Sequence, residues 1–486
     1  AGPLFRSQPF TWTTYPERLH EASVSCQFYQ HGLSGADVEN GNLGTNVLMC
    51  FKNFADATPG SALHERAMTA RTLDHLKQGV LADRLPQVSW ILPPAAYSEH
   101  PRWTPGYGAT FIAHALDALT ANPDVWAKTV FLVMYDENDG YFDHMPPPQP
   151  PTPVLPGQST VTTRDEIHNH LQSFRPDRHK ADDLPYGLGP RVPAFVISPW
   201  STGGFVCSEV FDHTSVLRFI EARFGVKETN ITPWRRAVCG DLTSAFDFSR
   251  KTTVKPPLPD TAAYRKIADA SCKLPSPVIP HQSTLEDIGD QERGARLARP
   301  LPYKLSADLL ETSADSVTFE IRNDGTSGAC FYVYRDGTEE TPRRHTLEPG
   351  KAITDVWQIE SAGQHDFTIL GPNGFARYFQ NAKPMDIQVQ ARGETQTGNL
   401  VLNLKNTAST EKKVRIQDNA YGAEDRFLSL KGNQSASVSV DLDASHHWYD
   451  LILSCSDEPG NQSRFAGHVE TGQTSITDPA MGNVLA

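Results

Sequence analysis

The sequence predicts an α/β region followed by an all-β region, and two observations carry this prediction. Over residues 1–250, short apolar runs alternate with helical patterns. After residue 305, β-like stretches recur at an offset of 83 residues, with no convincing long helix. Strand–helix alternation is typical of α/β domains, and recurring β-patterned units are typical of small sandwiches.

Three apolar runs are the strand candidates of the first region: residues 88–92 (VSWIL), 129–137 (TVFLVMYDE) and 192–200 (VPAFVISPW). Each run ends at proline, glycine or acidic residues, a pattern typical of buried parallel strands. Helices are predicted over residues 111–122 and 215–225. Because ligands gather at the carboxyl ends of strands in such folds, the loops after these runs are candidate sites.

The composition divides the chain into four parts. Residues 1–250 form the α/β region, and residues 251–302 are proline-rich, which predicts an extended linker or strap. Two β repeats are assigned to residues 303–384 and 385–486. The internal matches pair residues 316–326 with 399–409, 347–357 with 430–440, and 373–381 with 462–472. A spacer, stabilising or surface-binding role is expected of such repeats before a catalytic one.

Charge and composition exclude several classes of protein. The 486-residue chain has a net charge of -13, which argues against nucleic acid as its main partner. No apolar run approaches the length of a membrane span. The seven cysteines include no C-x-x-C pair, so a zinc ribbon or redox motif is not expected. The chain begins at Ala1 with neither an initiator Met nor a secretory signal, so processing or truncation is expected.

Carboxylates follow the second strand candidate. Asp136 and Glu137 stand at its end, and Asp139, Asp143 and His144 follow in one turn-rich loop. Oxygen ligands gathered at a strand end suit a hard divalent cation, which offsets the repulsion between clustered acids. The alternative is an Asx-rich turn around a glycine, with solvated carboxylates. The spacing leaves both interpretations open.

Two further loops carry chemical groups. After the first strand candidate come His100, which could protonate a leaving oxygen, and Arg102. Trp103 and Tyr107 in the same loop could surround a quaternary ammonium group, although a structural role is common for such residues. Ahead of the 215–225 helix, His213 is a candidate phosphate contact, and Asp212 could equally be a helix N-cap.

Five segments taken in order resemble the bacterial phosphocholine-type phospholipases C, a group within the phosphoesterase family that also contains acid phosphatases. The segments are SEHPRWTPGYG (98–108), YDENDGYFDHMPPP (135–148), RVPAFVISPWSTGG (191–204), FDHTSVLRFIEARFG (211–225) and PWRRAVCGDLTSAFDF (233–248). The resemblance implies an α/β core like that of the alkaline-phosphatase superfamily. It also implies a secreted or periplasmic bacterial enzyme acting on phosphatidylcholine or sphingomyelin at a membrane surface. The oligomeric state stays open.

The resemblance also assigns roles to residues. It implies one divalent metal ion, held in part by Asp136 and Glu137, and a hydroxyl nucleophile. His100, His144 and His213 would protonate the leaving alcohol or hold phosphate oxygens. Substrate binding would fall to Asp139, Arg102, Trp103 and Tyr107.

One part of the family pattern has no counterpart in this chain. The upstream Glu-Asn pair and the nucleophile segment are missing, so the sequence predicts an N-terminally truncated enzyme that is inactive alone. The alternatives are a phosphomonoesterase, or an inactive fragment that binds lipid or a surface.

Overall fold

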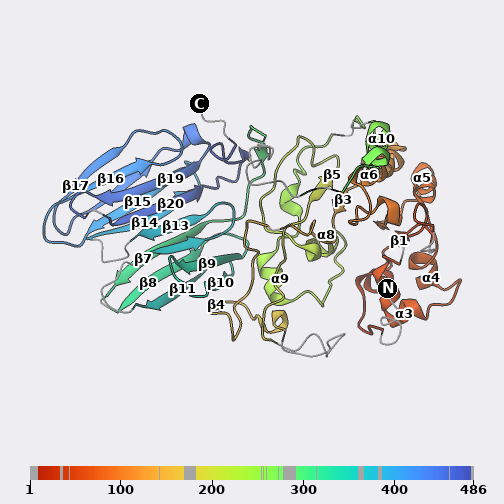
Figure 1. Cartoon of the computed structure of the whole chain (residues 1–486), viewed down its shortest axis with the longest axis horizontal. Coiled ribbons are helices and arrows are strands. Elements are labelled where there is room, and N and C mark those ends of the chain that lie inside the picture. The colour runs from red at the N-terminus through yellow and green to blue at the C-terminus, as the bar shows by residue number, and fades with distance from the viewer. Residues whose placement is uncertain are drawn as a thin grey trace.

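The computed structural model describes residues 9–482, apart from residues 33–36, 43, 142, 169–181, 253, 255–256, 259, 272, 277, 279–291, 314, 360–365, 381–385 and 459. The helices gather in one half of the molecule, and the long strands form the other half (Figure 1). This arrangement confirms the predicted order of an α/β region followed by an all-β region.

The α/β half is built from short elements. They are α2 (Tyr15–Glu21), β1 (Cys26–Tyr29), α3 (Lys52–Ala55), α4 (Ala62–Ala67), α5 (Leu73–Leu81), β2 (Val88–Ile91), α6 (Pro105–Thr120), α7 (Pro123–Trp126), β3 (Phe131–Met134), β4 (Gly157–Ser159), β5 (Ala194–Ile197), α8 (His213–Phe224) and α9 (Pro233–Val238). Strand β1 pairs with β2 in parallel, and β3 pairs with β5 antiparallel. The three predicted strands therefore exist as β2, β3 and β5.

Two details of the strand prediction are wrong. The β3–β5 pair is antiparallel, because the described residues between these strands contain no crossover helix to bring the chain back for parallel pairing. Strand β3 also ends at Met134, so Asp136 and Glu137 lie in the loop beyond the strand.

The helix signals read from the sequence are confirmed at α8. The Asp212 carboxylate accepts the Thr214 backbone N–H at 2.9 Å, so Asp212 is the N-cap. Gly225 ends the helix with φ 72°, a left-handed conformation that glycine adopts without a steric penalty. Helix α6 begins earlier than predicted, because Pro105 is favourable in a first helical turn.

Both strand pairs lie between the same two layers of helices. On one face, Ile91 of β2 and Phe131 of β3 pack in one cluster with side chains of α5 and α6. On the other face, α8 packs against Trp90 of β2 through one cluster and against Leu132 of β3 through another. The α/β half therefore has a strand layer covered on both sides.

In the described part of the β half, fourteen strands repeat one pattern of seven, and the short pair β6 (Leu297–Ala298) and β21 (Ser475–Ile476) lies outside this pattern. The first seven are β7 (Leu305–Thr312), β8 (Ser316–Asn323), β9 (Ala329–Arg335), β10 (Arg343–Leu347), β11 (Lys351–Gln358), β12 (Phe367–Leu370) and β13 (Ala376–Gln380). Their counterparts are β14 (Ile387–Glu394), β15 (Asn399–Asn406), β16 (Lys412–Asp418), β17 (Arg426–Leu430), β18 (Ser435–Val440), β19 (Trp448–Cys455) and β20 (Gln462–His468). The stretches matched in the sequence fall on equivalent strands, which confirms the duplication.

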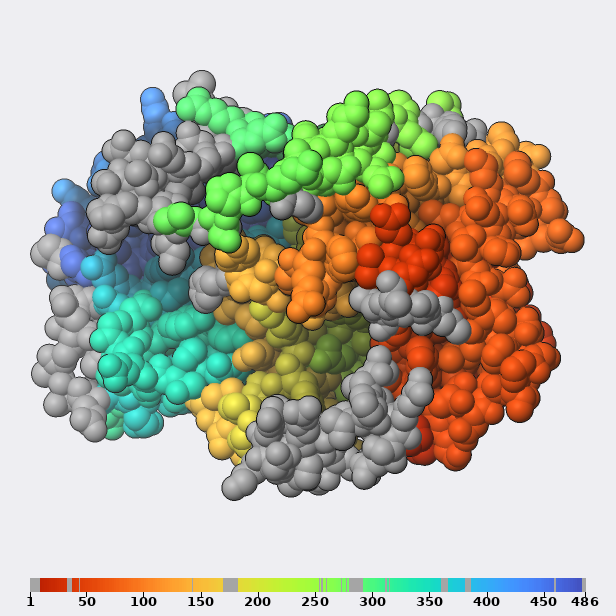
Figure 2. All heavy atoms as spheres, turned by 45° about the vertical axis from the view of Figure 1, so that its right-hand side comes forward, coloured from red at the N-terminus to blue at the C-terminus, as the bar shows by residue number. Residues whose placement is uncertain are grey.

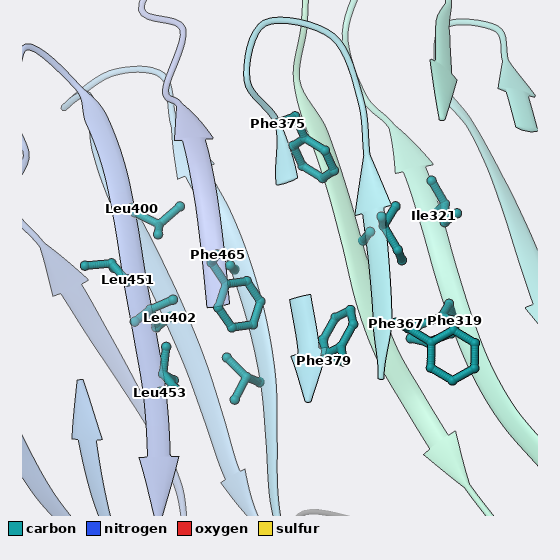
Figure 3. Packing of buried hydrophobic residues seen from close by; sticks show 14 of the residues in the cluster. Phe319, Ile321, Phe367, Phe375, Phe379, Leu400, Leu402, Leu451, Leu453 and Phe465 are labelled. Atoms are coloured by element: carbon teal, nitrogen blue, oxygen red, sulfur yellow. The ribbon is translucent and has the colours of Figure 1, made fainter. Parts of the chain in front are cut away.

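The two repeats share one sheet and one core. A nine-stranded sheet runs in the order β17-β16-β19-β20-β13-β12-β9-β10-β4, and β13 pairs directly with β20 across the repeat boundary. Sheets β11-β8-β7 and β14-β15-β18 accompany it. Phe319 and Phe379 of the first repeat belong to the same buried cluster as Phe465 and Leu402 of the second (Figure 3). The two repeats therefore form one continuous structure with a shared sheet and core, and they are not two independent domains.

The proline-rich segment is not extended throughout. Helix α10 (Ala262–Ser271) forms within it and packs on α6, where a Cβ on Gly106 would lie 2.8 Å from the Tyr264 carbonyl oxygen. The prediction of an extended strap is wrong for this stretch, because its four alanines and charged residues favour a helix. Figure 2 shows the green segment that includes α10 lying along the orange surface.

The two halves are joined by β4, which belongs to the α/β region but pairs in parallel with β10. The indole N–H of Trp234 donates to the Thr346 hydroxyl at 3.0 Å, and the Tyr332 hydroxyl donates to the Pro147 carbonyl at 2.6 Å. Within the described residues, none of the helices has the length and apolar character needed to cross a membrane. Six of the seven cysteines lie in this part of the chain, and all six are free thiols.

Candidate active site

A cavity of about 770 Å³ lies in the α/β half, between the two strand pairs. Strands β2 and β3, helix α6, the start of α8 and residues 12–16 line it, and most of its wall is apolar. Its polar side chains are Asn46, Ser98, Glu99, Asp136, Glu228, Asn230 and Arg235, with several threonines. An apolar cavity with few polar groups is the usual form of a ligand site.

Asp136 is the predicted metal ligand that reaches this cavity. It follows β3 directly, and both Asp136 and Glu137 are exposed. His213, the first residue of α8, donates from Nε2 to the Tyr135 carbonyl oxygen at 2.9 Å. His213 therefore lies next to Tyr135, the residue that precedes Asp136. The loop before α8 and the loop after β3 meet at this point.

The rest of the acidic loop is held by local hydrogen bonds. The Asp139 carboxylate accepts the Tyr141 backbone N–H at 2.9 Å, and Gly140 has φ 83°. These contacts match the Asx-turn interpretation for Asp139. Asp143 pairs with Arg191, whose Nη2 lies 2.8 Å from Oδ1, and these hydrogen bonds hold the pKa of Asp143 well below its usual range. His144 is exposed beside Asp143.

The loop after β2 places its predicted residues outside the cavity wall. His100 and Arg102 are exposed, and Trp103 is half-buried. Tyr107, in the first turn of α6, donates from its hydroxyl to Asp269 of α10 at 2.7 Å. The guanidinium carbon of Arg265 lies 4.6 Å from the centre of the Tyr107 ring. Tyr107 therefore already contacts a cation from within the chain.

Sequence reasoning missed a pair of residues in the cavity wall, Glu99 and Tyr135. The Tyr135 hydroxyl donates to the Glu99 carboxylate at 2.9 Å and joins the loops that follow β2 and β3. Burial raises the pKa of Glu99, although the Tyr135 hydrogen bond opposes this shift. Burial, followed by the contact with Glu99, raises the pKa of Tyr135 to about 12. The only sequence signal was that Glu99 precedes His100.

A second missed group surrounds Arg235, which also lines the cavity. Its guanidinium donates to Asp212 at 2.7 Å and to Glu166 at 2.9 Å, and both carboxylates are nearly buried. Burial lowers the pKa of Arg235, but the two carboxylates outweigh it and leave a net rise. Asp212 is thus both a helix cap and an ion-pair partner of Arg235, a cationic residue of the cavity wall.

The described side chains do not make a complete metal site. Among the residues that the structure describes, no group of three or more His, Cys, Asp or Glu side chains is arranged to hold a metal ion. Asp136 and Glu137 are suitable oxygen donors, but a divalent cation needs more ligands than these two. The chemistry of these two donors fits part of a site only.

The α/β half and the duplicated β half correspond to known families. Residues 4–227 match the profile described as the Phosphoesterase family. Residues 297–380 and 381–468 each match the profile described as bacterial phospholipase C, C-terminal domain. These matches define a bacterial phosphoesterase with a duplicated C-terminal domain.

The curated relatives narrow this class. The chain is 41% identical to a non-hemolytic phospholipase C of Burkholderia pseudomallei, over 98% of this chain and 71% of that protein. It is 41% identical to a non-hemolytic phospholipase C of Pseudomonas aeruginosa, over 99% of this chain and 69% of that protein. A hemolytic phospholipase C of the same organism is 39% identical to this chain, over 99% of this chain and 71% of that protein. The chain belongs to the bacterial phospholipase C group of the phosphoesterase family, a group of phosphodiester hydrolases.

Proposed function

We propose that this protein is a phospholipase C that hydrolyses phosphatidylcholine or sphingomyelin and releases phosphocholine with diacylglycerol or ceramide. The observation that carries the proposal is the 41% identity to phospholipases C over 98% of the chain. We also propose that the α/β half has the fold of the alkaline-phosphatase superfamily. The enzyme is proposed to be secreted or periplasmic and to act at a membrane surface.

The proposed chemistry begins with attack of a hydroxyl group on phosphorus. The bond from phosphorus to the glycerol or ceramide oxygen breaks, and a histidine gives its proton to that oxygen. His213 is the best placed of the three candidates, because it contacts the backbone next to Asp136. His100 and His144 are exposed and are proposed to hold phosphate oxygens. Water then releases phosphocholine.

A divalent metal ion is proposed as the cofactor, with Asp136 and Glu137 as two of its ligands. When bound, such an ion stabilises negative charge on phosphoryl oxygens. The remaining ligands and the attacking hydroxyl are proposed to come from polypeptide outside the residues described here, since these contain no complete metal site.

Headgroup binding is proposed for Trp103 and Tyr107, with the neighbouring Arg102 and with Asp139 from the loop after β3. The position of the Arg265 guanidinium over the Tyr107 ring supports this role, because it shows that the ring accepts a cation. A choline group would have to take the place of Arg265 or bind at the Trp103 side.

The test uses the product of the complete gene and phosphatidylcholine vesicles, with released phosphocholine as the readout. Asp136→Asn should abolish release, and His213→Ala should lower it by roughly 10²–10⁴-fold. Asp83→Asn is the control, because this exposed carboxylate is not a lining residue of the cavity and forms a long salt bridge of 4.0 Å with Lys128. Full activity of Asp136→Asn would contradict the proposed site. Hydrolysis of a phosphomonoester but not of the choline diester would contradict the proposed substrate.

A further inference from the structure

Helix α10 packs on the rest of the molecule through one narrow side. Within this helix, which the structure describes throughout, Ala268 is the only buried side chain, and Arg265 and Ser271 are half-buried. The helix is held on the first turn of α6, where Tyr107 donates to Asp269 and carries the Arg265 guanidinium over its ring. The other side chains of α10 are exposed to solvent.

The solvent side of α10 carries an apolar strip. Ala263, Ile267 and Ala270 stand at the i, i+4, i+7 spacing that places residues on one side of a helix, and all three are exposed. Ile267 is 68% exposed. A surface helix normally turns its apolar side to the core and its polar side to solvent. Helix α10 therefore has apolar side chains where a helix with no partner would have polar ones.

Exposed apolar side chains continue beyond the end of the helix. Residues 264–278 contain four large ones that are exposed, namely Tyr264, Ile267, Leu274 and Val278. A single exposed apolar side chain is ordinary, but a local concentration of them marks a surface that contacts something else.

The charge of this segment points to the kind of partner. Residues 262–274 contain Arg265, Lys266 and Lys273 against one carboxylate, Asp269, in a chain whose net charge is -13. Lys266 and Lys273 are exposed, and each directly precedes an exposed apolar residue. Such a mixture suits a phospholipid surface, where apolar side chains enter the layer and lysines reach the phosphates.

We propose that the outward side of α10, together with Leu274 and Val278, docks on the surface of a phospholipid layer. The choice of phospholipid as the partner rests on the proposed function. A protein partner fits less well, because a strip on one short helix is much smaller than a stable protein–protein interface.

The position of α10 agrees with this role. The Tyr107 ring, on which Arg265 rests, has its centre 5.3 Å from that of Tyr97, and Tyr97 lines the cavity that Asp136 also reaches. Figure 2 shows the segment that includes α10 on the outer surface of the molecule. Docking through α10 would therefore hold the loop after β2, with its proposed headgroup-binding residues, close to the lipid.

The test is co-sedimentation of the 486-residue chain with vesicles of phosphatidylcholine and phosphatidylglycerol. The Asp136→Asn form is used, so that binding is measured without hydrolysis. We expect Ile267→Glu to weaken vesicle binding by roughly ten-fold or more, because it removes an apolar contact and adds a negative charge. Added salt should also weaken binding, because it screens the attraction between the lysines and the lipid phosphates.

Phe427→Glu is the matched control. Phe427 of β17 is 74% exposed, and β17 lies at the far end of the molecule from α10 (Figure 1). The substitution makes the same change of charge and should leave vesicle binding unchanged. Equal weakening by both substitutions would overturn the proposal, and so would an absence of vesicle binding by the parent chain. Dimerisation that Ile267→Glu abolishes, without vesicle binding, would assign this surface to a second copy of the chain.

A second measurement needs no further substitution. Hydrogen exchange of residues 262–271 should slow by roughly ten-fold or more when vesicles are added, because lipid contact opposes local opening of the helix. Unchanged exchange at α10 in vesicle-bound protein would overturn the proposal. Neither readout depends on phosphocholine release, so the docking surface and the proposed reaction can fail separately.

Discussion

At the residue scale, Gly108 is the position where helix α6 makes room for the half-buried Glu99 carboxylate. A Cβ at Gly108 would lie 1.9 Å from Glu99 Oε1, closer than any real contact. In an open helix position, Gly→Ala is instead stabilising by about 1 kcal/mol. The close approach of Glu99 should therefore reverse the sign of this substitution.

We expect Gly108→Ala to lower the free energy of unfolding by about 1–3 kcal/mol, the usual cost of overpacking. In a Glu99→Ala background the same change should be neutral or stabilising. Urea denaturation of the four proteins of this cycle measures the coupling between the two positions. An equal cost of Gly108→Ala in both backgrounds would show that the Glu99 carboxylate does not occupy that space.

Asp355 gives a residue-scale prediction on pH. The buried carboxylate accepts from the Nε2 of His345 at 3.0 Å, from the indole of Trp357 at 2.7 Å and from Arg343. Burial opposes its charge, but these donors outweigh burial and leave the pKa of Asp355 lowered. A lowered carboxylate pKa contributes stability that is present above the unfolded value, near 4, and is lost as pH falls through the folded value.

Asp355→Asn should thus cost roughly 3–5 kcal/mol at pH 7, where a buried charge network is broken. The difference in unfolding free energy between the variant and the wild type should shrink as the pH falls below 4. Urea unfolding at several pH values measures this difference. Asp324→Asn in the same repeat is the control, because its contact with Arg322 is exposed and 3.8 Å long. A constant difference from pH 7 to pH 3 would contradict the prediction.

At the element scale, one buried asparagine recurs in each repeat. Asn323 at the end of β8 donates to the Ser327 and Leu347 carbonyls and accepts from Gly325 N–H. Asn406 at the end of β15 makes the same set, with donation to the Thr410 and Leu430 carbonyls and acceptance from Ala408 N–H. Each asparagine ties the end of one strand to the end of another in its repeat.

Asn323→Ala and Asn406→Ala should therefore have similar effects. Each leaves buried backbone groups without partners, at roughly 2–4 kcal/mol of unfolding free energy. Asn403→Ala is the matched control, because it lies exposed on the same strand as Asn406 and should cost about 0.5 kcal/mol or less. Chemical denaturation of the three variants compares them. A large loss of unfolding free energy for one variant and none for the other would contradict the prediction. The two asparagines would then share their hydrogen-bond geometry but not their contribution to stability.

The sequence predicted elements best where a local signal sufficed. Alternating apolar residues placed the β repeats at the right offset, and Asp212 with Gly225 marked the ends of α8. The prediction failed where contacts with residues distant in sequence determine the structure. Nothing near Gly157 indicates that β4 joins the β half, and the proline-rich context concealed α10.

The candidate site shows the same division. Asp136 was predicted from its position after an apolar run, and the structure places it in the cavity wall. Glu99 and Arg235 were missed, because their importance comes from burial and from partners far along the chain, Tyr135 for one and Asp212 with Glu166 for the other. His100 and His144 carry local signals, but the structure shows both exposed.

At the scale of the whole molecule, β4 is the strand that pairs the α/β half with the β half, beside the hydrogen bond from Gly328 N–H to the Ala237 carbonyl. Gly157 of β4 has φ 146°, and a Cβ there would lie 1.7 Å from the Arg344 carbonyl oxygen. Only glycine fits, because the obstacle is the backbone of the partner strand β10 and cannot turn away. The fit of this residue therefore controls how the α/β half docks on the nine-stranded sheet.

Gly157→Ala should uncouple the halves without unfolding either one. The substitution forces β4 away from β10, so calorimetry should show the main unfolding transition splitting in two, and hydrogen exchange should quicken at residues 157–160. Gly60→Ala is the matched control, since it also has a positive φ of 87° but nothing within 4 Å. Gly60→Ala should lower the free energy of unfolding by about 1 kcal/mol, the cost of placing alanine at a positive φ, and should leave the shape of the unfolding transition unchanged. If Gly157→Ala behaves like Gly60→Ala, the junction is held by Trp234 and Tyr332 instead, through their contacts with Thr346 and Pro147.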